Sequence, residues 1–168
     1  MVDTKTWREG ADFPEIEIIH YAPALASLFE SINVEWLNEY FHVTPQDLEI
    51  LRNPQRIINS GGIILFARVN ESIFGTAALV KIDVETFELI KMGVSSKMKG
   101  MGIGKALLQA IIKEAKNLGA KKIILETAKP LVAAISLYQK EGFVQTSGEE
   151  THPLFGRTTF KMEKVLRE

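Results

Sequence analysis

A glycine-rich segment in the second half of the chain has the residue types needed to bind phosphate groups. Gly100, Gly102 and Gly104 alternate with other residues just before a long amphipathic stretch, and Lys99 and Lys105 lie beside them. Glycine permits positive φ angles and lets the backbone approach a ligand closely. The first amides of a helix have no partner within it, and the helix dipole favours an anion there. The segment therefore indicates a phosphate-binding loop, with a ligand-free glycine turn as the alternative.

Two familiar phosphate-binding motifs do not fit this segment. A Walker A loop needs a glycine five positions before its Gly-Lys pair, where this chain has Lys99, and Ser or Thr after the lysine, where it has Ala106. A dinucleotide fingerprint beginning at either of the first two glycines needs Gly or Ala where the chain has Lys105 or Leu107. The segment therefore predicts neither a nucleoside triphosphatase nor a dinucleotide-binding enzyme.

Hydrophobic periodicity predicts the elements that position this loop. Residues 86–94 are expected to form a strand before it, and residues 102–118 a helix after it that ends at Gly119. Further strands are expected at 16–19, 63–69, 73–82, 122–125, 143–145 and 158–165, and further helices within 23–40, 44–51, 54–59 and 130–141. This order predicts a mixed α/β (α+β) domain over residues 15–168, after an N-terminal lead-in of residues 1–14.

Three motifs around the loop resemble the GNAT superfamily of acyl-CoA-dependent N-acyltransferases. The loop reads Lys99-Gly100-Met101-Gly102-Ile103-Gly104, where the family has Arg/Gln-x-x-Gly-x-Gly/Ala. Residues 88–94 are similar to the family's fourth strand, and residues 134–143 to its Ala-Ile-x-Leu-Tyr-x-x-x-Gly-Phe helix. Lys99 departs from the motif, as does Leu131, where members often have asparagine. The resemblance implies a mostly antiparallel sheet of about seven strands, flanked by helices and splayed between strands 4 and 5.

The resemblance also implies an activity and a cofactor. An acetyl group would pass from acetyl-CoA to a primary amine of a small molecule, peptide or protein, by direct attack in a ternary complex without a metal. The pantetheine arm would lie between the splayed strands, where Gly93 fits a bulge or a close backbone approach. The implied coenzyme A contacts are Met92, Gly93, Val94, Lys99, Gly100, Met101, Gly102, Ile103, Gly104 and Lys105.

Two residues are implied as catalytic. Glu88 lies six residues before Val94 and so on the same strand face, where it would accept the ammonium proton through water. Tyr138 matches the family tyrosine near the sulfur and would protonate the leaving thiolate. The structural alternatives are a solvated carboxylate for Glu88 and a packing residue for Tyr138. A non-catalytic acyl-CoA sensor is the competing function, and the presence of both side chains favours the enzyme.

The acceptor amine is expected beside the first helices. Trp36 and Tyr40 are four residues apart and share a helix face, which together with Glu88 would bind the acceptor. A helix packed on the sheet is the alternative explanation of that face. Three residues near the last strands also border the predicted pocket: His152, Phe155 and Arg157.

Composition and charge exclude several kinds of functional site and disfavour some kinds of binding partner. The 168 residues contain no cysteine, which excludes disulfides, thiolate metal sites and cysteine nucleophiles. A formal net charge of −1 disfavours nucleic acid and membranes as partners. That average conceals 14 acids and 6 bases in residues 1–90, against 8 lysines and one acid in residues 91–122. The lysine-rich stretch fits the phosphates of coenzyme A, and the acidic half is compatible with a cationic amine.

Localisation and assembly are less directly indicated. The first ten residues hold no apolar signal core, and the longest uncharged stretch, residues 57–67, is too short to span a membrane. These features lead us to expect a cytoplasmic protein. Dimers are common in the family, so a homodimer is one expected state, although no sequence feature marks an interface.

Overall fold

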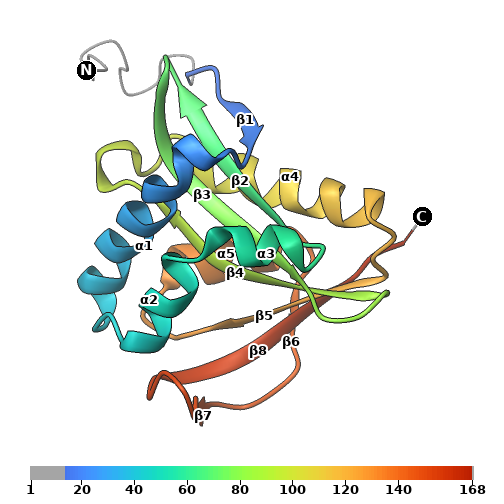
Figure 1. The fold of residues 1–168 in the computed structure, drawn as a ribbon. Coiled ribbons are helices and arrows are strands. Elements are labelled where there is room, and N and C mark those ends of the chain that lie inside the picture. Colours follow the sequence, from blue (N-terminus) through green and yellow to red (C-terminus); the bar gives the residue numbers. More distant parts are fainter. Residues whose placement is uncertain (1–13, 168) are drawn as a thin grey trace.

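An eight-stranded sheet runs through residues 14–167, the part of the chain that the computed structural model describes (Figure 1). The strand order is β1-β2-β3-β4-β5-β8-β6, with β7 also paired to β8. Neighbouring strands are antiparallel except β4 and β5, which are parallel. The strands are β1 (Glu17–His20), β2 (Ile63–Val69), β3 (Ser72–Lys81), β4 (Thr86–Val94), β5 (Lys122–Thr127), β6 (Val144–Gln145), β7 (Glu150–Thr151) and β8 (Thr158–Val165).

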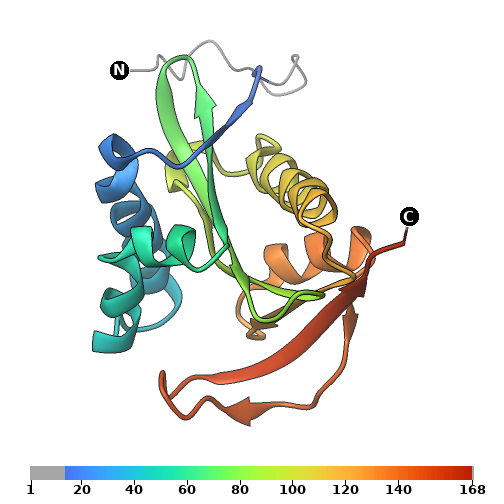
Figure 2. The ribbon, with the colours of Figure 1, turned by 45° about the vertical axis from the view of Figure 1, so that its right-hand side comes forward.

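Helices cover both faces of this sheet, as Figure 2 shows. One face carries α1 (Ala26–Tyr40), α2 (Pro45–Leu51) and α3 (Pro54–Asn59), and the other carries α4 (Ile103–Asn117) and α5 (Val132–Lys140). Two short 3-10 helices, η2 (Pro23–Leu25) and η3 (Ser96–Met98), precede α1 and the glycine loop. Each face has its own hydrophobic core, centred on α4 in one case and on α1 in the other.

Local sequence signals explain the best-defined helices. In α4, buried side chains recur at helical spacing from Ile103 through Leu107 and Ile111 to Ala115, so one face packs on the sheet. In α2, the Asp47 amide donates to the Thr44 hydroxyl at 3.1 Å, and the Thr44 amide donates to the Asp47 carboxylate at 2.9 Å. This capping box satisfies two backbone donors at the start of the helix.

The pairing of β4 with β5 ends halfway along β4. Its register extends only from the pair Thr86–Lys122 to the pair Leu89–Leu125, so the strands separate after Leu89. Just beyond this point β4 has a bulge, because two of its residues, Lys91 and Met92, oppose a single residue of β3. Lys91 has a φ of 49°, a left-handed conformation that few residues with a side chain adopt. The bulge and the separation together leave backbone groups of β4 without strand partners.

The predicted fold is confirmed, including the splay between strands 4 and 5. The sheet has eight strands rather than about seven because the two-residue strand β7 also pairs with β8. The predicted lead-in lies outside the described residues apart from Pro14. None of the helices in residues 14–167 combines the length and apolar character needed to cross a membrane.

Candidate active site

A cavity of about 460 Å³ extends along the unpaired part of β4 to the start of α4. We call it the loop cavity, because the glycine-rich loop forms one of its walls. Helices α1 and α5 complete it, with Trp36 on one side and Tyr138 on the other. Nine of the ten predicted coenzyme A contacts line this cavity: Met92, Gly93, Val94, Lys99, Gly100, Gly102, Ile103, Gly104 and Lys105. The tenth, Met101, does not line it and instead packs against the hydrophobic core.

The glycine loop leaves backbone donors available at the start of α4. Gly100 and Gly102 have φ angles of 77° and 83°, and a Cβ at either position would meet no atom within 4 Å. Gly102 is the N-cap of α4, and no side chain caps the helix there. The amides of the first turn therefore have no side-chain cap, and they lie at the positive end of the helix dipole. This arrangement suits an anion such as a pyrophosphate.

Of the two lysines beside the glycine loop, Lys99 and Lys105, Lys99 already has a carboxylate partner. Lys99 Nζ lies 2.9 and 3.0 Å from the carboxylate oxygens of Glu39 on α1, and 5.7 Å from the centre of the Tyr40 ring. Lys99 is thus already paired. Tyr40, predicted to contact the acceptor, lines the loop cavity beside this pair.

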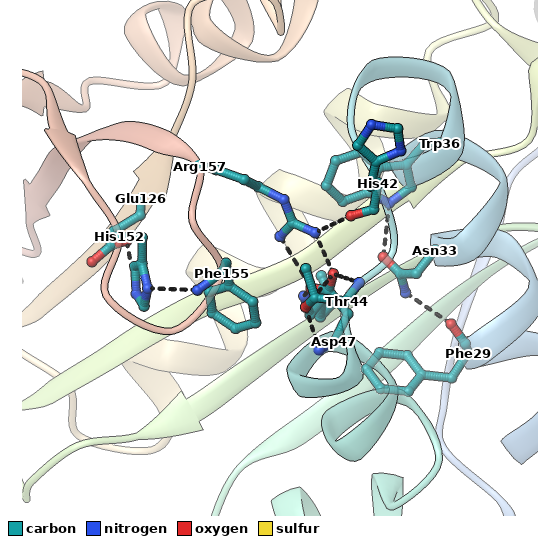
Figure 3. Close-up of polar contacts among 11 residues, drawn as sticks. Phe29, Asn33, Trp36, His42, Thr44, Asp47, Glu126, His152, Phe155 and Arg157 are labelled. Atoms are coloured by element: carbon teal, nitrogen blue, oxygen red, sulfur yellow. Dashed lines mark hydrogen bonds and ion pairs between the residues drawn. The ribbon is translucent and has the colours of Figure 1, made fainter.

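The side chain of Trp36 is a sufficient reason for glycine at position 93. A Cβ at this position would lie 2.2 Å from Cδ1 and 2.5 Å from Nε1 of Trp36. The indole is fixed in turn, because its N–H donates to the Asn33 side chain at 2.8 Å, and Asn33 donates to the Phe29 carbonyl at 2.8 Å (Figure 3). The close approach expected at Gly93 is therefore made by Trp36, and the bulge lies two residues earlier, at Lys91.

A second cavity of about 450 Å³ lies on the other side of the splay. We call it the β8 cavity, because Arg157 and Thr159 at the start of β8 contribute to it. Its other walls come from α1, α2, α3, β3, β4 and β5, and Glu88, His152 and Phe155 are among its residues. The two cavities meet where β4 and β5 separate, at residues that line both: Trp36, Leu89, Ile90, Lys91, Glu126, Thr127 and Leu131.

Glu88 and Glu126 occupy different positions relative to this junction. Glu88 is partly buried in the β8 cavity but does not line the loop cavity. Burial raises the pKa of Glu88, the nearby charge of Glu126 raises it further, and Lys161 opposes both. Glu126 lines both cavities and pairs with His152, whose Nε2 is 3.4 Å from the carboxylate. Sequence reasoning missed Glu126, whose only signal is a carboxylate in a strand beside the predicted splay.

A buried charge cluster of Asp47, Lys91 and Arg157 borders the β8 cavity, which Lys91 and Arg157 line (Figure 3). The Asp47 carboxylate has no exposed surface and accepts hydrogen bonds from Arg157 and from Lys91, whose Nζ is 2.6 Å away. Arg157 also donates to the His42 carbonyl at 2.8 Å. Sequence reasoning placed Arg157 near the acceptor but missed the roles of Lys91, which it counted in the lysine-rich stretch, and of Asp47, which lies in the predicted helix of residues 44–51.

Burial and pairing compete within this cluster. Burial alone would raise the pKa of Asp47, but hydrogen bonds from Arg157 and Lys91 outweigh it and hold the pKa well below its usual range. Burial lowers the pKa of the Lys91 ammonium, and its hydrogen bond to Asp47 opposes that change. Asp47 is therefore a fixed anion, and both cations depend on it.

Tyr138 lies between the loop cavity and the core. Its side chain is 7% exposed and packs against Phe143, with ring centres 5.8 Å apart. Burial raises the pKa of Tyr138 to about 12, so the hydroxyl stays protonated at any ordinary pH. The ring satisfies the packing role, and the residue also lines the loop cavity.

No group of three or more metal-ligating side chains occurs within residues 14–167. The site instead combines an anion-binding helix start, an unpaired strand, two carboxylates and a buried phenol. Such a set can hold an extended phosphate-bearing ligand and move protons at the junction of the two cavities.

Comparisons with known proteins agree with this geometry. The model of the acetyltransferase (GNAT) family matches residues 25–143. A human relative, N-acetyltransferase 8B, is 28% identical over 97 residues, which cover 55% of this chain and 43% of the relative. The crystal structure of a GNAT-family acetyltransferase from Staphylococcus aureus Mu50 has a TM-score of 0.79 and 25% identity, covering 91% of this chain and 100% of that one.

A further solved structure extends the likeness in fold. It is of yncA, a putative acetyltransferase from Salmonella typhimurium with its cofactor acetyl-CoA, with a TM-score of 0.75, 22% identity and coverage of 92% of this chain and 95% of that one. The matches span between 42% and 65% of the length of the first curated relatives. Because the family model covers well over half of the sequence, the chain belongs to the acetyltransferase (GNAT) family.

Proposed function

We propose that the protein transfers an acetyl group from acetyl-CoA to a primary amine. The observation that carries this proposal is the separation of β4 from β5 after Leu89, which joins a cavity at the start of a helix to a second cavity lined by carboxylates. An extended thioester could enter from one side and an amine from the other. The yncA structure was solved with acetyl-CoA, which supports the choice of donor.

The residues of the loop cavity fit coenzyme A. The free amides that follow Gly102 would bind the pyrophosphate, and Lys105 on the same wall would add a positive charge. The pantetheine arm would lie along Met92–Val94, whose backbone has no β5 partner. The amide of Val94 is our candidate for the donor that polarises the thioester carbonyl.

The chemistry then needs three proton movements. An ammonium, with a pKa of about 10, must lose one proton before its nitrogen can attack the thioester carbon. The C–N bond forms, the C–S bond breaks, the nitrogen loses a second proton, and the thiolate gains one. Net, one proton is released for each amide formed.

Two carboxylates could accept the proton from the amine. Glu88 has the raised pKa that suits a base, but it lies on the acceptor side only. Glu126 lies at the junction and pairs with His152, which could pass the proton onward. We therefore assign proton removal to this pair of carboxylates, with Glu126 nearer the thioester. Tyr138 would donate to the departing thiolate.

The test is thiol release from acetyl-CoA across a panel containing amino acids, a polyamine, an aminoglycoside and a peptide with a free N-terminus. The absence of cysteine from the chain removes protein thiols from the background of a thiol-reactive dye. We expect turnover with at least one class. Acetyl-CoA binding without turnover of any amine would instead support an acyl-CoA sensor.

Two matched glycine variants test the coenzyme A assignment. Gly102 and Gly119 both have a φ of 83° and both face open space, at opposite ends of α4. Alanine at either position carries the same backbone strain, about 1–2 kcal/mol. Only Gly102→Ala should raise the apparent KM for acetyl-CoA, by about tenfold or more. Equal effects of the two variants on KM would show that the loop does not bind the cofactor.

A further inference from the structure

One part of the wall of the β8 cavity holds two cations against a single carboxylate. Lys91 and Arg157 both line the cavity, and both pair with Asp47, which is completely buried. One carboxylate thus serves two cations. Burying a charge without a full counter-charge is costly. An anion arriving in the cavity would offset this cost.

Both cations also have hydrogen-bonding capacity that the protein does not use. Within residues 14–167, the buried Nε of Arg157 has no hydrogen-bond partner. The Lys91 side chain is 10% exposed, and Asp47 is the only acceptor that the described residues offer to its ammonium. The Phe155 ring lies 4.9 Å from Lys91 Nζ and 5.2 Å from Arg157 Cζ, so it holds both cations in position.

The same cavity has carboxylates away from this cluster. Figure 3 shows Glu126 and His152 on one side of the Phe155 ring, and Asp47 and Arg157 on the other. Glu126 and Lys91 both line the loop cavity as well, so a proton acceptor and a cation both border the junction of the two cavities. The rest of the β8 cavity is mainly apolar, with Trp36, Leu37, Phe41, Ile50, Ile57 and Leu89 among its residues.

We propose that the acceptor is an α-amino acid with an apolar side chain, whose carboxylate binds Lys91 and Arg157 while its amino group faces Glu126. A carboxylate and an amine on one carbon match a cation and a proton acceptor at one junction, and the apolar walls match the side chain. The inference rests on the proposed N-acetyltransferase function, because it names the acceptor of that site. The product would be an N-acetyl amino acid, which keeps its carboxylate.

The direct test compares each amino acid with its own carboxamide. L-phenylalanine, L-leucine and L-methionine are assayed against L-phenylalaninamide, L-leucinamide and L-methioninamide by thiol release from acetyl-CoA. We expect kcat/KM to be about 10- to 100-fold higher for the acids, the range of a hydrogen bond to a charged group. The comparison is a stringent one. An amino acid amide has a lower ammonium pKa than its acid, so more of it is present as the reactive free amine, and without a carboxylate site the amide should react faster.

Matched variants then assign the preference to the cluster. Arg157→Gln should reduce the preference for acid over amide to within about threefold. Arg68→Gln is the control, because Arg68 also pairs with a carboxylate, that of Glu17 at 2.8 Å, but lies on β2 outside both cavities. The preference is a ratio measured on one protein sample, so partial unfolding of a variant cancels from it. The wild-type comparison needs no variant at all.

Calorimetric binding in the presence of coenzyme A separates this inference from the proposed function. Tighter binding of L-phenylalanine than of its amide, without turnover, would support the carboxylate site and contradict the acetyltransferase. Turnover of amides or of peptide N-termini as efficient as that of the acids would support the acetyltransferase and overturn the carboxylate site. Equal binding of acid and amide, or binding of neither, would also overturn it.

Discussion

Replacing Gly93 by alanine should destabilise the protein because of Trp36 alone. The three heavy atoms nearest to a Cβ at this position all belong to the indole, and the closest, at 2.2 Å, is about 1.2 Å short of ordinary van der Waals contact. The indole cannot withdraw freely, because its N–H is bonded to the buried side chain of Asn33. Overpacking of this kind costs about 1–3 kcal/mol. We expect a loss near the upper end, about 2–3 kcal/mol, or roughly 4–10 °C in Tm.

The backbone at Gly93 gives no second reason for the glycine. Its φ is not in the positive range that restricts other residues. With Trp36 replaced by alanine, Gly93→Ala should therefore be neutral, or stabilising by about 0.4–1 kcal/mol through the entropy of the unfolded chain. The two substitutions together predict a coupling energy of about 2–4 kcal/mol.

Urea unfolding of the wild type, both single variants and the double variant, followed by circular dichroism, measures this coupling. An equal cost of Gly93→Ala with and without Trp36 would refute the explanation. So would unchanged stability combined with a raised KM for acetyl-CoA, because that result would assign the glycine to the pantetheine arm.

Three further predictions concern charge and proton transfer. Asp47→Asn leaves two buried cations without a counter-charge, so the free energy of unfolding should fall by about 3–5 kcal/mol in urea titrations. The lowered pKa of Asp47 also means that its stabilisation is complete above the unfolded pKa of about 3.9 and is lost as the pH falls toward the folded pKa, so acid should destabilise the wild type more than Asp47→Asn. Tyr138→Phe should lower kcat about 10- to 100-fold with little change in KM, and Tyr21→Phe, outside both cavities, should not. Lys105→Gln should raise the KM for acetyl-CoA more than Lys99→Gln does, most clearly at low salt, because Lys99 is already paired with a glutamate.

The fold could be predicted because its elements carry local signals. The start of α2 has a local signal, because Thr44 and Pro45 are adjacent residues that favour a helix N-terminus. The structure forms a capping box there. The hairpin between β2 and β3 turns at Asn70 and Glu71, which have φ angles of 47° and 72°, and the break between two apolar runs marked its place. The glycine loop is equally local, because its glycines and the helix that follows are contiguous.

The charge cluster could not be predicted, because its members are far apart in the sequence. Asp47 is 44 residues from Lys91 and 110 from Arg157. Each has a sufficient local explanation, as a helix-capping acid, a strand lysine or a surface arginine. Only the β4 bulge, which gives Lys91 its left-handed φ, and the turn before β8, which carries Arg157, bring them together. The contact with Trp36 that requires glycine at position 93 could not be predicted from the sequence either, because Trp36 lies 57 positions earlier.

The lysine-rich stretch of residues 91–122 is therefore not one basic surface for the phosphates of coenzyme A. Lys91 turns inward to Asp47 beside the β8 cavity, and Lys99 pairs with Glu39 on α1. Lys121 and Lys122 pair with glutamates near the paired end of β4 and β5, away from the point where the two strands separate. What remains at the loop is mainly the helix start and Lys105, so backbone amides must provide much of the binding to a pyrophosphate. At position 99, where the family motif has arginine or glutamine, the lysine side chain already pairs with Glu39 of α1, so the backbone amides are our main candidates for binding the anion.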